Sequence, residues 1–293
     1  TEGDFHVSGF DWSPDGSQVA YVRVPDPGLI SSAESDIYVL DVATAESRPL
    51  VTGPGSDGSP EWSPDGQWIL FSEFDRDLGS SYYLNGELAR IPSRGGDIEV
   101  LTRDFDEDLG GATWTPNGIR LTASHRTARK VYTLNVASRT MTEMALPSHV
   151  VGSVSFTPDG RTMAFTGQGD SGFSEVYVTR VDVSTPPVKL TDMSSQLDGW
   201  MVGTREVITW KSEDGAEIEG VLHKPEGYDP SRRYPLLVVI HGGPTGTSRP
   251  VVNTGGVYPI THWLAKGAVV LEPNYRGSAG YGEAFRSLNV RNL

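Results

Sequence analysis

Short runs of alternating hydrophobic and polar residues fill the first two thirds of the chain, and turns rich in proline and glycine separate them. Residues 19–23 (Val-Ala-Tyr-Val-Arg) and 68–71 (Trp-Ile-Leu-Phe) are two such runs. Neighbouring side chains of a strand point to opposite faces, so short runs bounded by turn residues predict β-strands. The pattern therefore predicts a first region built of many short strands.

A seven-residue motif occurs four times in this region, at residues 10–16, 60–66, 112–118 and 154–160. Each copy ends in Ser/Thr-Pro-Asp/Asn-Gly, where proline and glycine favour successive positions of a tight turn. The aromatic residues at 12, 62, 114 and 156 are 50, 52 and 42 positions apart. These periods are typical of β-propeller blades.

Further strands complete each repeat as a four-stranded unit. We expect the third strands at residues 36–40, 82–84, 130–134 and 175–178, and the fourth near residues 48–51, 98–101, 141–146 and 188–190. The repeats predict a β-propeller region over residues 1–198, with the four aromatic residues in the blade cores. Four visible blades suit either a small complete ring or part of a larger one.

The pattern changes after residue 198. Two strands, 205–211 and 217–225, flank an Asp214-Gly215 hairpin turn. Residues 234–240 form a continuous apolar run, as expected for a strand buried on both faces of a parallel sheet. A helix over 258–266, a second buried strand over 268–273 and another helix over 283–288 follow in the predicted order of elements.

Two glycine-rich segments follow these two apolar strands: His241-Gly242-Gly243-Pro244, and residues 274–282, which read Asn-Tyr-Arg-Gly-Ser-Ala-Gly-Tyr-Gly. With the preceding repeats, this order resembles the prolyl oligopeptidase family of serine peptidases, in its acylaminoacyl-peptidase and dipeptidyl-aminopeptidase-like branch. The resemblance implies that residues 199–293 begin an α/β-hydrolase domain. It also implies a propeller of seven or eight blades that admits only short or unfolded peptides to the active site.

The resemblance makes Gly243 and Gly242 the candidate catalytic residues, through backbone N–H groups of an oxyanion hole. Arg276 and Tyr281 are weaker candidates for substrate binding; Arg276 can instead hold its turn, and Tyr281 can pack. We expect His241 to fix its loop by hydrogen bonding. The remaining histidines receive no role: His6, His125, His149, His223 and His262.

The sequence contains no Gly-x-Ser-x-Gly motif, which an α/β-hydrolase uses to present its nucleophile. Ser278 comes closest, but Arg276 occupies the first glycine position. We therefore expect the catalytic Ser, Asp and His beyond Leu293, in a second chain or a further segment. Two alternatives stay open: a non-catalytic propeller binding module with a vestigial hydrolase segment, and an esterase or amidase of small molecules.

Composition narrows the partners further. The formal net charge of −14 argues against binding nucleic acid or anionic lipid, and the absence of cysteine excludes thiolate chemistry. No apolar run is long enough for a membrane helix. We expect a peptide substrate, no cofactor or metal, solvated loops at the acidic runs 104–108 and 170–175, and possible homo-oligomers. A cytoplasmic location is expected, with secreted or periplasmic locations left open.

Overall fold

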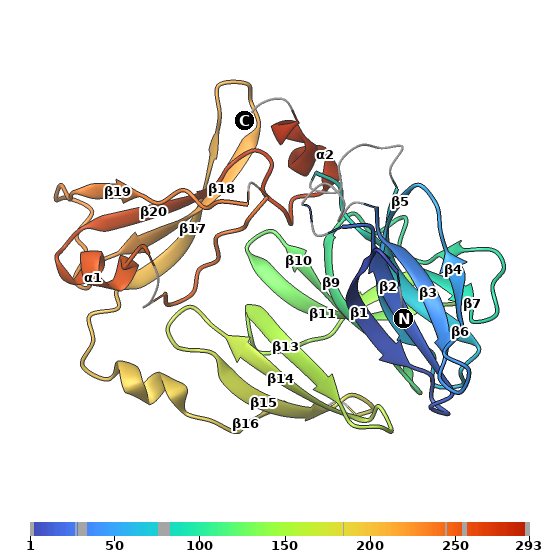
Figure 1. Cartoon of the computed structure of the whole chain (residues 1–293). Coiled ribbons are helices and arrows are strands. Elements are labelled where there is room, and N and C mark those ends of the chain that lie inside the picture. The colour runs from blue at the N-terminus through green and yellow to red at the C-terminus, as the bar shows by residue number, and fades with distance from the viewer. Residues whose placement is uncertain are drawn as a thin grey trace. The chain divides into compact units, whose positions relative to one another are not determined.

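The computed structural model describes residues 3–26, 28, 34–75, 83–183, 185–243, 245–253 and 257–290. Strands are the main regular elements of this part of the chain, and its helices are few and short (Figure 1). No helix among the described residues is long and apolar enough to cross a membrane.

The four sequence repeats each contribute four strands, as predicted. Repeats 1 and 2 each form a separate four-stranded sheet, whereas a parallel pairing at Arg129 and Val150 joins repeats 3 and 4 into one eight-stranded sheet. Repeat 1 contains β1 (His6–Trp12), β2 (Gln18–Val24), β3 (Asp36–Asp41) and β4 (Ser47–Val51). Repeat 2 contains β5 (Gly55–Trp62), β6 (Trp68–Asp75), β7 (Glu87–Pro92) and β8 (Glu99–Val100). Repeat 3 contains β9 (Asp108–Thr115), β10 (Gly118–His125), β11 (Ala128–Asn135) and β12 (Thr140–Glu143). Repeat 4 contains β13 (Val150–Phe156), β14 (Thr162–Gln168), β15 (Glu175–Arg180) and β16 (Val188–Lys189). The closure of a ring and the number of its blades stay predictions.

The Pro-Asp-Gly turns join the first two strands of their repeats. In the first turn Gly16 has φ +70°, and its N–H donates to the Ser13 carbonyl oxygen at 2.9 Å. The Ser13 hydroxyl donates to Asp15 at 2.7 Å, and this bond, followed by those from the Ser17 amide and hydroxyl, lowers the pKa of Asp15 to about 2. Left-handed backbone is the reason for glycine at this position.

The third strand of repeat 2 corrects the prediction. It was expected at residues 82–84 but is β7, Glu87–Pro92, which pairs with β6 in an antiparallel register. Tyr83 and Leu84 precede it in a bend, and residue 82 lies outside the described residues. Two aromatic residues beside a leucine favour a strand locally, but the pairing with β6 selects the segment further along the chain.

The repeated aromatic residues do not share one environment, which corrects the prediction that all four lie in blade cores. Trp62 is buried and joins a core shared by repeats 1 and 2, whereas Trp12 is 52% exposed. The Trp62 amide also donates to the Asp11 carboxylate of repeat 1 at 2.8 Å. Trp12 is exposed because no described residue covers it as repeat 1 covers Trp62.

The same bridge joins repeats 2 and 3. The Glu61 carboxylate accepts the amide of Trp114 at 2.7 Å, so the residue before each of the first two tryptophans holds the next tryptophan. Burial raises the pKa of Glu61 to about 7, and nearby Asp11 acts in the same direction. Repeats 1 to 3 are therefore joined by carboxylates as well as by apolar cores.

A buried carboxylate holds the connection that follows repeat 4. Glu175 was predicted in a solvated loop but is only 4% exposed, at the start of β15. Burial opposes its ionisation, but hydrogen bonds from the Thr191 hydroxyl and the amides of Met193 and Ser194 outweigh that cost and lower its pKa to about 2. The bonds fix the start of a 3₁₀ helix, Met193–Leu197.

The C-terminal segment, residues 199–290, contains one four-stranded sheet in the order β17-β18-β20-β19. Its strands are β17 (Thr204–Lys211), β18 (Glu217–Lys224), β19 (Leu236–Val238) and β20 (Val269–Asn274). The predicted hairpin joins β17 and β18, and β19 runs parallel to β20. The helix α1 (Ile260–Ala265) packs on β20, and α2 (Glu283–Arg286) leads into a 3₁₀ turn, Ser287–Asn289.

The apolar run 234–240 is not buried on both faces, contrary to prediction. Its strand β19 is short and lies at the edge of the sheet, with Leu236 59% and Val238 51% exposed. Leu237, between them, packs against the core of Ile260, Leu264 and Val270. One face of β19 is therefore covered and the other is not covered by any described residue.

The residue contacts divide the chain into two compact units. The first comprises Thr1–Ala123 with Tyr132–Glu143, and the second comprises Ser124–Val131 with Met144–Leu293. The tip of the β10–β11 hairpin therefore belongs with the second unit. The predicted domain boundary between residues 198 and 199 stays a prediction.

Candidate functional site

The loop after β19 and the glycine-rich turn after β20 lie against each other in the second unit. The Tyr275 hydroxyl donates to the carbonyl oxygen of His241 at 2.7 Å. The Thr247 hydroxyl donates to the carbonyl oxygen of Ala279 at 2.8 Å, and the Ala279 amide donates to the Thr245 carbonyl oxygen at 3.3 Å. Parallel strands bring their carboxyl ends to one sheet edge, so the two segments meet although they are more than 30 residues apart.

His241, three residues after the end of β19, holds this arrangement. Its ring stacks on Tyr275 with 4.5 Å between centroids, and its Nε2 lies 3.1 Å from the Ser278 hydroxyl oxygen. Burial lowers the pKa of His241, which favours the neutral ring at pH 7. These contacts agree with the expected loop-fixing role.

Gly242 and Gly243 are both exposed, directly after His241. Gly243 has φ +135°, and a Cβ there would lie 2.7 Å from the Gly246 nitrogen and 2.9 Å from the Thr245 nitrogen. A Cβ at Gly242 would meet no atom within 4 Å. Within the described part of the chain, no residue accepts the N–H of Gly242 or Gly243. Two exposed backbone donors are therefore available to an anionic atom at this loop.

Asn274, the last residue of β20, fixes the far end of the same loop. It is fully buried; its Oδ1 accepts the Ser248 amide at 2.7 Å, and its Nδ2 donates to the Ser248 carbonyl oxygen at 3.0 Å. The Nδ2 also donates to the Tyr281 hydroxyl oxygen at 2.9 Å, and that hydroxyl donates to Glu219 at 2.9 Å. Burial, and then the nearby Glu219 charge, raise the pKa of Tyr281 well above its usual range.

The candidate substrate residues already have partners inside the chain. The half-buried Tyr281 belongs to the Asn274 and Glu219 network. Arg276 is exposed and forms an ion pair with Asp214 in the β17–β18 turn. Their roles in substrate binding stay predictions.

Ser278, the nearest match to a nucleophile motif, has no exposed surface, and its hydroxyl donates to the Tyr275 carbonyl oxygen at 2.7 Å. His223, to which sequence reasoning gave no role, is also fully buried and lies 2.6 Å from Glu272. Both residues hold the sheet and its turn together. No group of three or more potential metal ligands occurs within the described ranges.

Sequence reasoning missed Arg126, in the turn between β10 and β11. Its guanidinium lies 3.1 Å from Glu217 and 3.0 Å from Glu219, both on β18. The backbone N–H of Arg126 donates to the Gly280 carbonyl oxygen at 2.6 Å. These partners are about 90 to 155 positions away, so no motif or spacing could have revealed them.

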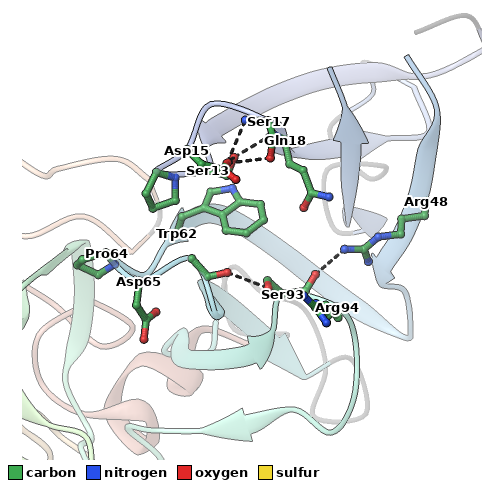
Figure 2. A pocket seen from close by; sticks show the side chains of 12 residues that line it. Ser13, Asp15, Ser17, Gln18, Arg48, Trp62, Pro64, Asp65, Ser93 and Arg94 are labelled. Carbon is green, nitrogen blue, oxygen red and sulfur yellow. Dashed lines mark hydrogen bonds between the residues drawn. The ribbon is translucent and has the colours of Figure 1, made fainter. Parts of the chain in front are cut away.

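A separate pocket of about 470 Å³ lies in the first unit, between turns of repeats 1 and 2 (Figure 2). The Trp62 indole lines it, and no described residue pairs with the indole N–H. Arg48 also lines it and donates to the Ser93 carbonyl oxygen at 2.5 Å, while burial lowers the Arg48 pKa. The lining comes from turns far apart in the chain, so the sequence pattern does not predict this pocket.

Comparison with known proteins gives relatives named dipeptidyl-peptidase 5. Dipeptidyl-peptidase 5 of Aspergillus fumigatus is 26% identical over 303 residues, covering 95% of this chain and 40% of the relative. Dipeptidyl-peptidase 5 of Arthroderma otae is 26% identical over 298 residues, covering 94% of this chain and 39% of the relative. No family model matches the sequence. The chain thus spans about 40% of the length of the curated relatives it matches.

Solved structures share the fold. A puromycin hydrolase mutant complexed with PGG has a TM-score of 0.74 and 21% identity, covering 96% of this chain and 43% of that one. A puromycin-hydrolyzing peptidase of Mycobacterium tuberculosis has a TM-score of 0.73 and 18% identity, covering 98% of this chain and 45% of that one. Pyrococcus horikoshii acylaminoacyl peptidase has a TM-score of 0.55 and 15% identity, covering 97% of this chain and 60% of that one. With the repeats and the two glycine-rich segments, these findings support the resemblance to the prolyl oligopeptidase family of peptidases, and the chain covers only part of the length of each of these proteins.

Proposed function

We propose that the chain is part of a serine peptidase that hydrolyses short peptides through an acyl-enzyme. The observation that carries the proposal is the pair of exposed N–H groups at Gly242 and Gly243, at the end of a strand parallel to its neighbour. Backbone donors fixed in this position suit the oxygen of a tetrahedral intermediate. The Gly243 N–H is the donor we assign to that oxygen.

The proposed reaction needs a serine, a histidine and an acid from outside these 293 residues. The serine oxygen attacks the peptide carbonyl carbon while the histidine takes its proton. Negative charge moves to the carbonyl oxygen, where the Gly243 N–H stabilises it. The intermediate collapses, the histidine protonates the leaving amine, and water then hydrolyses the acyl-enzyme. A further segment or a second chain supplies the three side chains, since the sequence has no Gly-x-Ser-x-Gly motif.

The proposed substrates are short peptides, admitted past a propeller that excludes folded proteins. This part of the proposal rests on the family and on relatives named dipeptidyl-peptidase 5. The proposed location is cytoplasmic.

Labelling with a fluorophosphonate probe, with intact mass measured under denaturing conditions, tests the proposal on the protein as its source produces it. We expect a species larger than 31.7 kDa, or a second chain, to take the probe. Peptide amides and acyl esters are then compared as substrates, because a faster ester reaction with no peptide cleavage would favour a small-molecule esterase.

A non-catalytic binding module is the alternative, and the pocket beside Trp62 is the observation that favours it. A single species of 31.7 kDa that takes no probe would contradict the peptidase proposal and favour this alternative.

A further inference from the structure

We propose that Arg126 is a positioning residue for the loop that carries Gly242 and Gly243. The inference rests on the proposed function only where it predicts an effect on catalysis. Arg126 does not touch the loop itself, so it would act through the residues that hold the loop's far end. The contacts that carry this inference all lie within the second unit.

The backbone of Arg126 forms the first contact. Its φ of +52° is unusual for a residue with a side chain, and this turn aims its N–H at the Gly280 carbonyl oxygen, 2.6 Å away. A Cβ at Gly280 would lie 3.1 Å from the Arg126 carbonyl oxygen, which is tighter than most Cβ contacts, and the φ of +86° at Gly280 also favours glycine. The arginine turn and the glycine-rich turn are therefore fitted to each other.

The side chain of Arg126 forms the second contact. One terminal nitrogen lies 3.0 Å from Glu219, whose side chain is only 7% exposed, and the other lies 3.1 Å from Glu217. A buried carboxylate without its cation is strongly destabilising. We therefore expect the loss of Arg126 to weaken the other contacts of Glu219. Glu219 holds the Tyr281 hydroxyl at 2.9 Å.

From Tyr281 the hydrogen bonds lead back to the loop. Asn274 donates to the Tyr281 hydroxyl oxygen and makes two hydrogen bonds with Ser248, five residues after Gly243. A second tie runs from the same hairpin, because Arg249 donates to the Ser124 hydroxyl at 3.0 Å. The hairpin tip thus secures the end of the loop through two neighbouring residues, Ser248 and Arg249.

Placement matters because an oxyanion donor acts only over a narrow range of distance. A donor must lie about 2.7–3.1 Å from the developing oxygen, and a misplacement of about 1 Å can cost about a hundredfold in rate. Loosening Ser248 would let the Gly243 N–H vary in position without removing it. We therefore expect a loss in kcat rather than in substrate affinity.

The test uses hydrogen exchange measured by mass spectrometry on the protein as its source produces it. In Arg126→Gln we expect at least tenfold faster exchange in peptides covering residues 245–249 and 275–282. Arg139→Gln is the matched control, because Arg139 also has a positive φ of +57° and an ion pair, 3.2 Å to Glu99, but lies in the first unit. The control should change these peptides less than twofold.

Two further variants separate positioning from general stability. Arg126→Lys keeps a cation for Glu219 and should restore slow exchange in part, while Arg126→Gly keeps the left-handed backbone without the guanidinium. With a peptide substrate, we expect kcat about tenfold lower in Arg126→Gln and KM within twofold of the unaltered protein.

Unchanged exchange in residues 245–249 of Arg126→Gln would overturn the inference. So would faster exchange spread over the whole protein with no rescue by Arg126→Lys, since that outcome describes a stability residue. If the unaltered protein takes no fluorophosphonate and cleaves no peptide, the proposed function fails, and the exchange result still decides whether Arg126 secures the loop.

Discussion

The Pro-Asp-Gly turns of the repeats and the loop after β19 both depend on glycine, but they are held in different ways. In the first turn, the Ser13 hydroxyl, Asp15 and the Gln18 amide close a set of hydrogen bonds within six residues. The loop at Gly242 and Gly243 is held by residues more than 25 positions further along the chain, such as Asn274 and Tyr275. Local bonds give a repeated scaffold, whereas distant bonds fix the backbone donors of one loop.

This difference determines how far the effect of a substitution extends through the molecule. A substitution in a repeat turn should lose only the stability that the preferred conformation of that turn provides. A substitution in a long-range contact should release every segment that the contact joins. The following variants test that comparison in order of expected effect.

Glu175→Ala should have the largest effect, because the carboxylate holds Thr191, Met193 and Ser194 from 16 to 19 positions away. We expect a loss of about 3 kcal/mol in the free energy of unfolding at pH 7, measured with urea, as buried donors lose their acceptor. The pKa of Glu175 is lowered to about 2 in the fold, so its stabilisation is present above pH 4.5 and disappears as the pH falls towards 2. A loss under 0.5 kcal/mol, or one that persists at pH 2, would contradict this account.

Glu61→Gln should raise the free energy of unfolding at high pH, by less than Glu175→Ala lowers it. The fold raises the pKa of Glu61 to about 7, so the native state binds a proton that the unfolded chain has released. The free energy of unfolding therefore falls as the pH rises from 4.5 to 7. The glutamine can still accept the Trp114 amide, so the variant should be about 2 kcal/mol more stable than the unaltered protein at pH 8 and equal to it near pH 4.5. Urea unfolding at both pH values measures the difference; equal stability at pH 8 would show that burial costs Glu61 little.

Gly16→Ala should cost about 1 kcal/mol, because a side chain is disfavoured at φ +70° although it would meet no atom. Gly242→Ala is the matched control: its Cβ also has free space, but its φ is not in the left-handed region, so thermal unfolding should barely change. Equal losses of stability in the two variants would contradict the distinction between Gly16, whose backbone conformation favours glycine, and Gly242, whose backbone conformation does not.

Arg276→Gln should have the smallest effect. Its ion pair with Asp214 is long-range but exposed on both sides, and such pairs contribute about 0.5 kcal/mol or less. A double-mutant cycle with Asp214→Asn measures the coupling. A coupling above 1 kcal/mol would show that exposure does not weaken this contact, while a raised KM for peptides would support a role in substrate binding.

The sequence predicts the local features well. The repeat spacing locates the four-strand units, the Pro-Asp-Gly motif locates their turns, and Asp214-Gly215 locates the hairpin of β17 and β18. These features depend on residues close together in the chain, so the pattern contains them.

Features that depend on neighbours are not predictable in the same way. Trp12 and Trp62 share a motif but not an environment, because repeat 1 covers Trp62 and no described residue covers Trp12 in the same way. Glu175 appears in an acidic run that favours a solvated loop, but distant donors bury it. Arg126 has no motif at all. The two glycines of the candidate site were found through a family resemblance, whereas the contacts that hold their loop required the fold.

The most direct test of the central claim is a crystal structure of the fluorophosphonate-labelled protein. We expect a phosphorus bonded to a serine oxygen and a phosphoryl oxygen about 2.7–3.1 Å from the Gly243 nitrogen. A labelled serine whose phosphoryl oxygen binds other donors, with the Gly243 N–H facing solvent, would contradict the role assigned to this loop.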